Sequence, residues 1–220
     1  MVEPSTSFRE FEHQGWSTES VTLAYHELIS GLTKQAIEPL LEAAGVRQGM
    51  AVLDVATGGG YAAAACGARG AAAVGVDFST TQVALARREH PQLEFMEADA
   101  AALPFSDQNF DAVVSNFGIL HFPDPDAALR EAFRVLRDGG RMAFTAWDSP
   151  DACVGFGAVL NAVQRHGILN VPLPPGPNFF LFSDPEQCRR SLHAAGFVDP
   201  AVTKIHKCGA CPRPTRCSRR

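Results

Sequence analysis

Two aspartates and a run of glycines are the residues of this chain whose types and spacing best suit ligand binding. Residues 52–60 read Val-Leu-Asp-Val-Ala-Thr-Gly-Gly-Gly, and residues 74–77 read Val-Gly-Val-Asp. The apolar run in each segment predicts a short buried strand, and the glycines predict a turn where a ligand can approach the backbone. Asp77 ends the second strand, where a carboxylate can bind the hydroxyls of a ribose. Together the segments predict a nucleoside-cofactor site.

Asp54 helps to distinguish between a dinucleotide and S-adenosylmethionine as the cofactor. It ends the first strand just ahead of the glycines, where a dinucleotide site would hold pyrophosphate, and its carboxylate would repel phosphate. S-adenosylmethionine has no phosphate and carries an ammonium and a sulfonium, which a carboxylate attracts. The sequence therefore favours S-adenosylmethionine over NAD, although Gly58-x-Gly60-x-x-Ala63 also fits the looser dinucleotide pattern.

The elements that must position these residues alternate along the chain. A glycine turn (residues 58–60) after the first strand, followed by helices between successive strands, is typical of a doubly wound, mostly parallel α/β sheet. Ligands of such sheets bind outside the carboxyl ends of the strands, so Gly58–Gly60, Asp77, Asp99 and Asn116 should share one rim. The predicted strands are residues 51–55, 72–76, 93–97, 110–115, 140–146 and 198–205.

We expect a single domain over residues 1–220, a length that suits one domain with a substantial core. Residues 1–19 are polar and predicted to be irregular, and apolar positions at helical spacing predict two helices within residues 20–44. Residues 1–46 would then hold N-terminal cap helices, 47–147 the cofactor-binding core, 148–205 substrate-side helices and a sixth strand, and 206–220 an irregular tail.

Composition excludes several classes of function. A formal net charge of −5 gives no general attraction to nucleic acid, so we expect no nucleic-acid partner. No apolar run is long enough to span a bilayer, and the N-terminus lacks a basic-then-apolar signal region. We therefore expect a cytoplasmic protein that is a monomer or a homodimer.

From about Tyr25 to Ile205 the chain resembles the class I S-adenosylmethionine-dependent methyltransferases that act on small molecules, and it is similar to the ubiquinone/menaquinone-biosynthesis group. Asp54-x-Ala56-x-Gly58-x-Gly60 resembles their first motif, in which many members have glycine where this chain has Ala56. Residues 110–116 and 134–140 resemble two later motifs. The resemblance implies a Rossmann-like methyltransferase fold, here with the seventh strand missing or altered, because none is readable after the sixth.

The resemblance also implies roles for ten residues. Asp54, Thr57, Gly58 and Gly60 match positions that contact the methionine end of the cofactor, and Asp77 matches the ribose-binding acid. Phe78, Ser79, Asp99 and Ala100 match positions beside the adenine, and Asn116 matches a position at the mouth of the pocket. Simpler interpretations exist: Asp77 as a helix N-cap, and Asp99 and Asn116 as turn residues. We expect Asp77 to be accessible to solvent when the site is empty.

Three residues are candidates for acting on the methyl acceptor. His121 follows the fourth strand on the same rim, and a histidine there could deprotonate the acceptor; the alternative is an ordinary surface histidine. Tyr25 and Trp16 lie in the segment that folds over the cofactor in the family, and they are predicted substrate contacts, with ordinary helix packing as the alternative.

The tail contains Cys208, Cys211 and Cys217 just after His206. Cys-x-x-Cys is half of a zinc site, but the remaining spacing is irregular, so we expect no metal. Arginines and prolines predict poor order from about residue 206 onward. The sixth strand would then be an exposed edge, which favours dimerisation.

The predicted function is methyl transfer from S-adenosylmethionine to a small-molecule acceptor, with an oxygen, nitrogen or carbon nucleophile. One alternative is a catalytically degenerate S-adenosylmethionine-binding protein. Another is a nicotinamide-dependent reductase, but short-chain reductases need a lysine four residues after a tyrosine. Tyr25 and Tyr61 are followed at that distance by Ile29 and Ala65.

Overall fold

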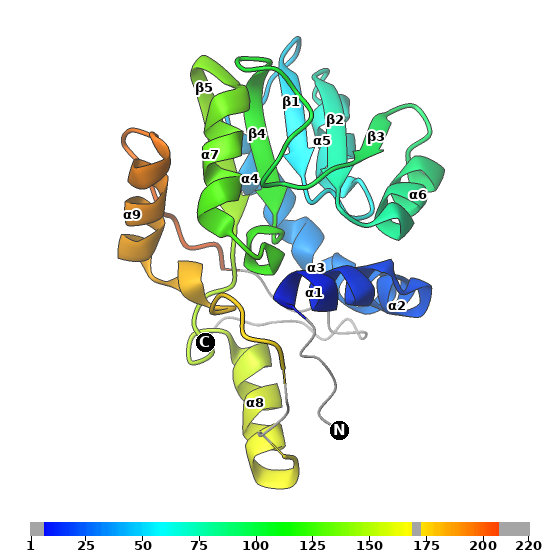
Figure 1. Ribbon diagram of the computed structural model, residues 1–220, viewed down its shortest axis with the longest axis vertical. Helices are drawn as coiled ribbons and strands as arrows, with labels where there is room; N and C mark the ends of the chain where they lie inside the picture. Colours follow the sequence, from blue (N-terminus) through cyan, green and yellow to red (C-terminus); the bar gives the residue numbers. More distant parts are fainter. Residues whose placement is uncertain (1–6, 169–172, 207–220) are drawn as a thin grey trace, which may run out of the picture.

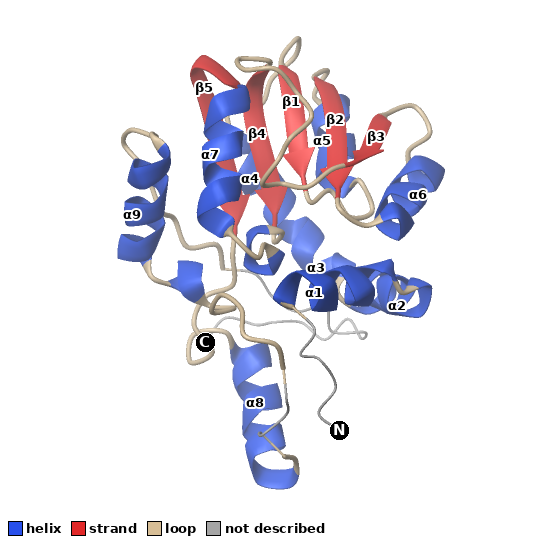
Figure 2. Ribbon diagram, viewed as in Figure 1, coloured by secondary structure: helices blue, strands red, loops and turns tan. Residues whose placement is uncertain are grey.

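A five-stranded parallel sheet forms the centre of the molecule (Figures 1 and 2). This computed structural model describes residues 7–168 and 173–206. The strand order is β3-β2-β1-β4-β5, so the order reverses between β1 and β4, and the predicted doubly wound α/β fold is confirmed. The strands are β1 Ala51–Val55, β2 Ala72–Asp77, β3 Glu94–Glu97, β4 Phe110–Asn116 and β5 Leu136–Thr145.

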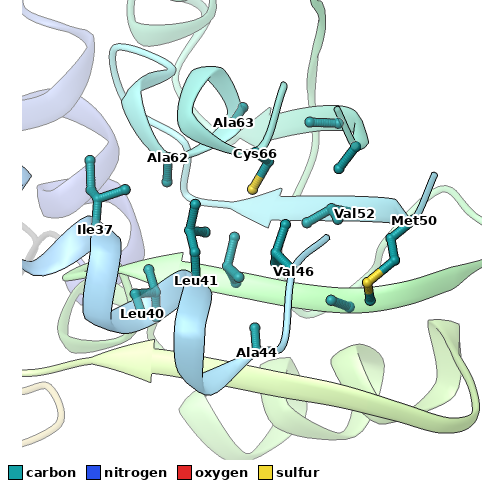
Figure 3. Packing of buried hydrophobic residues seen from close by; sticks show 14 of the residues in the cluster. Ile37, Leu40, Leu41, Ala44, Val46, Met50, Val52, Ala62, Ala63 and Cys66 are labelled. Atoms are coloured by element: carbon teal, nitrogen blue, oxygen red, sulfur yellow. The ribbon is translucent and has the colours of Figure 1, made fainter. Parts of the chain in front are cut away.

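Helices cover both faces of the sheet because the central strands are apolar on both sides. On one face, α5 (Tyr61–Ala68) packs against β1 and β2, and α4 (Ile37–Ala43) packs against β4 and β5. Figure 3 shows Leu40, Leu41, Ala63, Cys66 and Val52 among the buried side chains of this layer. On the other face lie α7 (Pro125–Val135) and, outside it, α9 (Pro185–Ala195). Helix α6 (Thr80–Glu89) flanks β3.

The N-terminal helices lie across the carboxyl ends of the strands (Figure 1). They are α1 Phe8–Ser17, α2 Glu19–Leu28, α3 Ser30–Thr33 and the 3-10 turn η1 Lys34–Ala36. The prediction that residues 1–19 are irregular is wrong for residues 8–17. Ser7 Oγ accepts a hydrogen bond from Glu10 N at 3.2 Å, and Glu10 Oε2 accepts one from Ser7 N at 2.9 Å. This capping box starts α1 although the helix buries none of its residues.

The predicted sixth strand at residues 198–205 is also wrong. Residues 201–206 have no regular structure, and Val198 is 82% exposed. Asp199 adopts φ 50° before Pro200, so the chain turns instead of extending along the sheet. Among the described residues the sheet therefore ends at β5. Residues 207–220, with Cys208, Cys211, Cys217 and any seventh strand, lie outside the described part of the chain.

The segment after β5 leaves the sheet. Helix α8 (Val154–His166) buries none of its residues and extends away from the sheet beyond the N-terminal helices (Figure 1). Two 3-10 turns, η2 (Ile119–His121) and η3 (Leu181–Ser183), connect the core elements. No helix in the described part of the chain is both long and apolar enough for a membrane span.

Candidate functional site

The glycine turn between β1 and α5 has the backbone that its sequence predicts. Gly58 and Gly60 adopt φ 52° and 80°, in the left-handed region that glycine enters without strain. Ala56 also adopts this region, with φ 56°. The departure from the family motif therefore falls where a glycine would be less strained. Gly60 N donates to Thr57 O at 2.9 Å, which closes the turn at the start of α5.

Asp54 lies beneath this turn, with 1% of its surface exposed. Its Oδ2 accepts hydrogen bonds from Thr57 Oγ1 at 2.6 Å and from Ala63 N at 2.9 Å. Burial raises the pKa of Asp54 to about 7, although these two hydrogen bonds lower it and the charge of Asp77 raises it further. Its Oδ1 is buried and has no hydrogen-bond partner among the described residues.

Asp77 joins the ends of β1 and β2. Its Oδ2 accepts from Gly58 N at 2.9 Å and its Oδ1 from Ser79 N at 3.0 Å. Only 5% of Asp77 is exposed, so the expectation of a solvent-accessible carboxylate is wrong. The side chain is buried by the two backbone groups and by helices α1 and α2 above it, which together form the cover of the site. Burial raises its pKa to about 6, against the lowering effect of the hydrogen bonds.

A pocket opens above Asp77 at the carboxyl edge of the sheet. It has an empty volume of ≈ 500 Å³, including space open to solvent. Its walls come from the ends of β1, β2 and β3, from the segment after β4, and from α1. Of the predicted site residues, those that line it are Asp77, Phe78, Asp99, Ala100 and His121.

Two side chains of α1, Arg9 and Glu12, complete the wall of this pocket. Arg9 forms an ion pair with Asp99. Asp99 Oδ1 also accepts from Ala101 N at 2.9 Å, as a turn residue would. Burial opposes ionisation of Asp99, but the hydrogen bonds from Arg9 and Ala101 outweigh it and lower its pKa.

Ser79, which follows β2, connects the sheet to helix α1 of the cover. It is fully buried, caps the N-terminus of α6, and donates from Oγ to Trp16 O at 2.9 Å. Phe78 meets the ring of His13 edge to face, with centroids 5.7 Å apart. These contacts bring the predicted adenine-side residues together beneath α1.

His121 is held by the cover rather than lying free on the surface. Its Nδ1 lies 2.7 Å from Glu12 Oε2, and Trp16 Nε1 donates to the same oxygen at 3.1 Å. Trp16 also packs edge to face on His121, with centroids 4.9 Å apart. Trp16 Nε1 also lies 3.4 Å from His121 Nδ1, a longer contact than the 2.7 Å between Nδ1 and Glu12 Oε2. Because the carboxylate only accepts, the shorter contact favours a proton on Nδ1 and a lone pair on Nε2.

Asn116 and Tyr25 do not line the pocket. Asn116 Nδ2 donates to Thr33 O at 3.2 Å, and its Oδ1 accepts from Thr145 Oγ1 at 2.9 Å, so it ties α3 to β5. Tyr25 packs edge to face on Trp16 at 5.0 Å, and burial raises its pKa. Both arrangements are those of structural residues.

Sequence reasoning missed Arg9, Glu12 and His26, all of which belong to α1 or α2. His26 rests on the glycine turn, and its Nε2 lies 3.0 Å from Gln82 Oε1. The spacing Glu12-x-x-x-Trp16 was the one available signal, because it places both side chains on one helix face. Within residues 7–168 and 173–206, no three His, Cys, Asp or Glu side chains are grouped to hold a metal ion.

Comparison with known proteins finds a family match in the core of the chain. Residues 53–144, which include the glycine turn, Asp77, Asp99 and His121, match the family model described as a methyltransferase domain. Over these residues the chain is similar to the class I S-adenosylmethionine-dependent methyltransferases. It is 42% identical over 110 residues to the demethylmenaquinone methyltransferase of Beutenbergia cavernae, covering 50% of this chain and 46% of that protein. It is 42% identical over 123 residues to that of Thermus thermophilus, covering 53% and 54%. The chain thus spans about half the length of these curated relatives.

Solved structures extend the likeness to the fold. Haemonchus contortus phosphoethanolamine N-methyltransferase 2, solved with S-adenosylhomocysteine, superposes with a TM-score of 0.63 at 25% identity, covering 88% of this chain and 45% of that one. The [4+2]-cyclase SpnF superposes with a TM-score of 0.62 at 21% identity, covering 88% and 74%. Since a protein named as a cyclase shares the fold, function must be argued from the site.

Proposed function

We propose that this protein binds S-adenosylmethionine at the carboxyl edge of its sheet and transfers the methyl group to a small-molecule acceptor. The observation that carries the proposal is the buried carboxylate of Asp77, fixed by Gly58 N and Ser79 N in the wall of a pocket. Each oxygen accepts one backbone hydrogen bond and keeps a lone pair for a ribose hydroxyl. Asp99, Ala100 and Phe78 would hold the adenine, and the glycine turn would hold the methionine end.

The residues present fit the cofactor. Asp54 Oδ1 is a buried oxygen without a partner among the described residues, and it borders the turn where an ammonium would lie. When bound, S-adenosylmethionine supplies an electrophilic methyl group on its sulfonium. Alignment of the acceptor with that methyl would provide most of the rate enhancement, so the chain needs few acid–base groups.

His121 is proposed as the base that takes the proton of the acceptor. Its Nε2 lone pair is available because Nδ1 faces Glu12. His121 Nε2 would take the acceptor's proton as the acceptor's electron pair bonds to the methyl carbon, the carbon–sulfur bond breaks and S-adenosylhomocysteine is released, and the carboxylate of Glu12 would stabilise the resulting imidazolium. The proton then leaves to solvent.

An aromatic acceptor is favoured by the side chains next to His121. Phe179 meets His121 edge to face at 6.3 Å, and Phe156 and Trp147 continue the aromatic row at 5.7 Å and 5.2 Å. Relatives named demethylmenaquinone methyltransferases support the same class. Trp16 would act on the acceptor only through its packing on His121, and Tyr25 only through its packing on Trp16.

Titration calorimetry tests the cofactor. S-adenosylmethionine and S-adenosylhomocysteine should bind with micromolar affinity, and NAD should not bind. Tight NAD binding without S-adenosylmethionine binding would end the proposal and favour a reductase. Binding without methyl transfer to any acceptor would indicate a degenerate enzyme.

The base is tested with phenol and 1,4-naphthohydroquinone as probe acceptors. His121→Gln and Glu12→Gln should each lower the rate constant of transfer about 100-fold. Their affinity for S-adenosylhomocysteine should stay within about twofold of the wild type, since neither residue is assigned to the cofactor. Equal rates in the wild type and both variants would remove His121 from the chemistry.

A further inference from the structure

His26 of α2 rests directly on the glycine turn. A Cβ atom added to Gly59 would lie 2.5 Å from His26 Cε1 and 3.1 Å from His26 Nδ1, closer than side chains pack. Only glycine at position 59 therefore leaves room for the imidazole. The ring stands over the part of the site assigned to the methionine end of the cofactor.

A chain of hydrogen bonds fixes which ring nitrogen carries the proton. Thr22 Oγ1 donates to Trp16 O at 2.9 Å, so toward Gln82 it can only accept, and Gln82 Nε2 lies 3.5 Å from it. The other end of that amide, Gln82 Oε1, faces His26 Nε2 at 3.0 Å. An amide oxygen only accepts, so Nε2 carries the proton and Nδ1 carries the lone pair.

The lone pair on His26 Nδ1 is buried and has no hydrogen-bond partner among the described residues. Burial lowers the pKa of His26, against the opposing effect of Gln82, so the ring is neutral. Asp54 Oδ1 is a second unpartnered, buried acceptor beside the same turn. Buried polar groups are nearly always hydrogen-bonded, so the lone pair of His26 Nδ1 calls for a donor from a ligand.

We infer that His26 Nδ1 accepts a hydrogen bond from the α-ammonium of the amino-acid end of the cofactor. The inference rests on the proposed function, because S-adenosylmethionine supplies that group. A primary ammonium offers three donors and no acceptor, which suits the lone pair of Nδ1. A carboxylate does not suit this nitrogen, because two acceptors would face each other.

Titration calorimetry with two commercial probes tests the inference. S-adenosylhomocysteine contains the amino-acid end, and 5′-methylthioadenosine lacks it. In His26→Gln the side-chain amide reaches the place of Nε2 and keeps a partner for Gln82, but nothing replaces Nδ1. This variant should bind S-adenosylhomocysteine about tenfold more weakly and 5′-methylthioadenosine within about twofold of the wild type.

His26→Asn is the matched variant, because its short side chain places an oxygen near Nδ1 and gives up the contact with Gln82. It should recover most of the affinity for S-adenosylhomocysteine. A loss as large as in His26→Gln would overturn the inference, because an acceptor placed near Nδ1 would then fail to restore binding. Thermal unfolding of both variants checks that they fold.

Two analogues of S-adenosylhomocysteine identify the group that His26 contacts. The analogue without its amino group should bind the wild type and His26→Gln equally, and the analogue without its carboxyl group should keep the tenfold difference. The reverse pattern, or an equal loss for 5′-methylthioadenosine, would overturn the inference. A wild type that binds neither commercial probe would instead overturn the proposed function.

Discussion

The floor and the cover of the pocket differ in the sequence separation of the residues whose contacts hold each of them in place. The floor comprises residues 54–60 and 77–79, and the cover comprises α1 and α2. The hydrogen bonds of the floor join residues that are separated by 2, 3, 9 and 19 positions along the chain. Contacts of the cover with the rest of the site span 56, 63, 90 and 109 positions. The floor is therefore encoded by two short segments that lie close together in the sequence, whereas the cover depends on tertiary packing.

The two regions also differ in burial. The floor buries two carboxylates under backbone hydrogen bonds, whereas α1 buries none of its residues. Changes in the floor should therefore disturb both folding and binding, and changes in the cover should act mainly on binding.

The largest contrast is expected from one substitution made in each region. An alanine at Gly60 would hold φ 80° and place its Cβ 2.8 Å from Phe95 Cζ, so Gly60→Ala should lower the free energy of unfolding by about 3 kcal/mol. Gly15 in α1 has open space around it, so Gly15→Ala should raise it by about 0.5–1 kcal/mol. Urea unfolding measures both, and a Gly60→Ala protein as stable as the wild type would contradict the strained turn.

Asp77→Ala should be the next largest change. Gly58 N and Ser79 N would lose their acceptor in a buried place, which should cost about 2 kcal/mol of unfolding free energy. Binding of S-adenosylhomocysteine should weaken at least about tenfold in calorimetry. Asp138→Ala, at an exposed aspartate, is the control and should change stability by less than about 0.5 kcal/mol.

The buried carboxylates predict a pH dependence of stability. Folding raises the pKa of Asp54 to about 7 and that of Asp77 to about 6, so the folded state holds more protons than the unfolded state between those values and about 4. Their contribution to the free energy of unfolding should therefore fall as pH rises from about 4 to about 7. Urea unfolding of Asp54→Asn across this range should show a weaker fall than the wild type. Parallel curves would mean that Asp54 titrates normally.

The smallest effect is expected in the cover. The Arg9–Asp99 ion pair is exposed, so Arg9→Ala should change the free energy of unfolding by less than about 0.5 kcal/mol. It should raise the affinity for S-adenosylhomocysteine about two- to threefold, because Asp99 no longer has to leave Arg9. Calorimetry in high salt should abolish the difference by screening the pair. A loss of affinity would assign Arg9 to the ligand.

The sequence predicted the floor well because the floor depends on local rules. An apolar run followed by glycines has few alternatives to a strand and a tight turn, and the alternation of elements indicated the parallel sheet. Asp77, Asp99 and His121 were placed on one rim by topology alone, since parallel strands end at the same edge.

The sequence could not predict the cover, because Glu12 and His26 reach the site only through contacts with residues far along the chain. Helix α1 was missed although Ser7-x-x-Glu10 is a capping box, since its polar composition gives no buried stripe. The sixth strand was predicted from apolar residues that have no neighbouring strand among the described residues beyond the turn at Asp199. Composition alone does not reveal whether a partner strand exists.

The shallow attachment of α1 has a consequence for rates. Helix α1 covers the pocket with polar side chains and buries none of its own residues. It can therefore detach without disturbing the core. Ligand entry and product escape then become gated by this local opening, and the association rate constant should fall below the value for an open cleft and level off at high ligand concentration. Amide hydrogens of α1 should exchange with solvent far faster than those of β1 and β4. The rates of ligand binding and product release would then be set by a ten-residue helix rather than by the sheet that carries the binding motif.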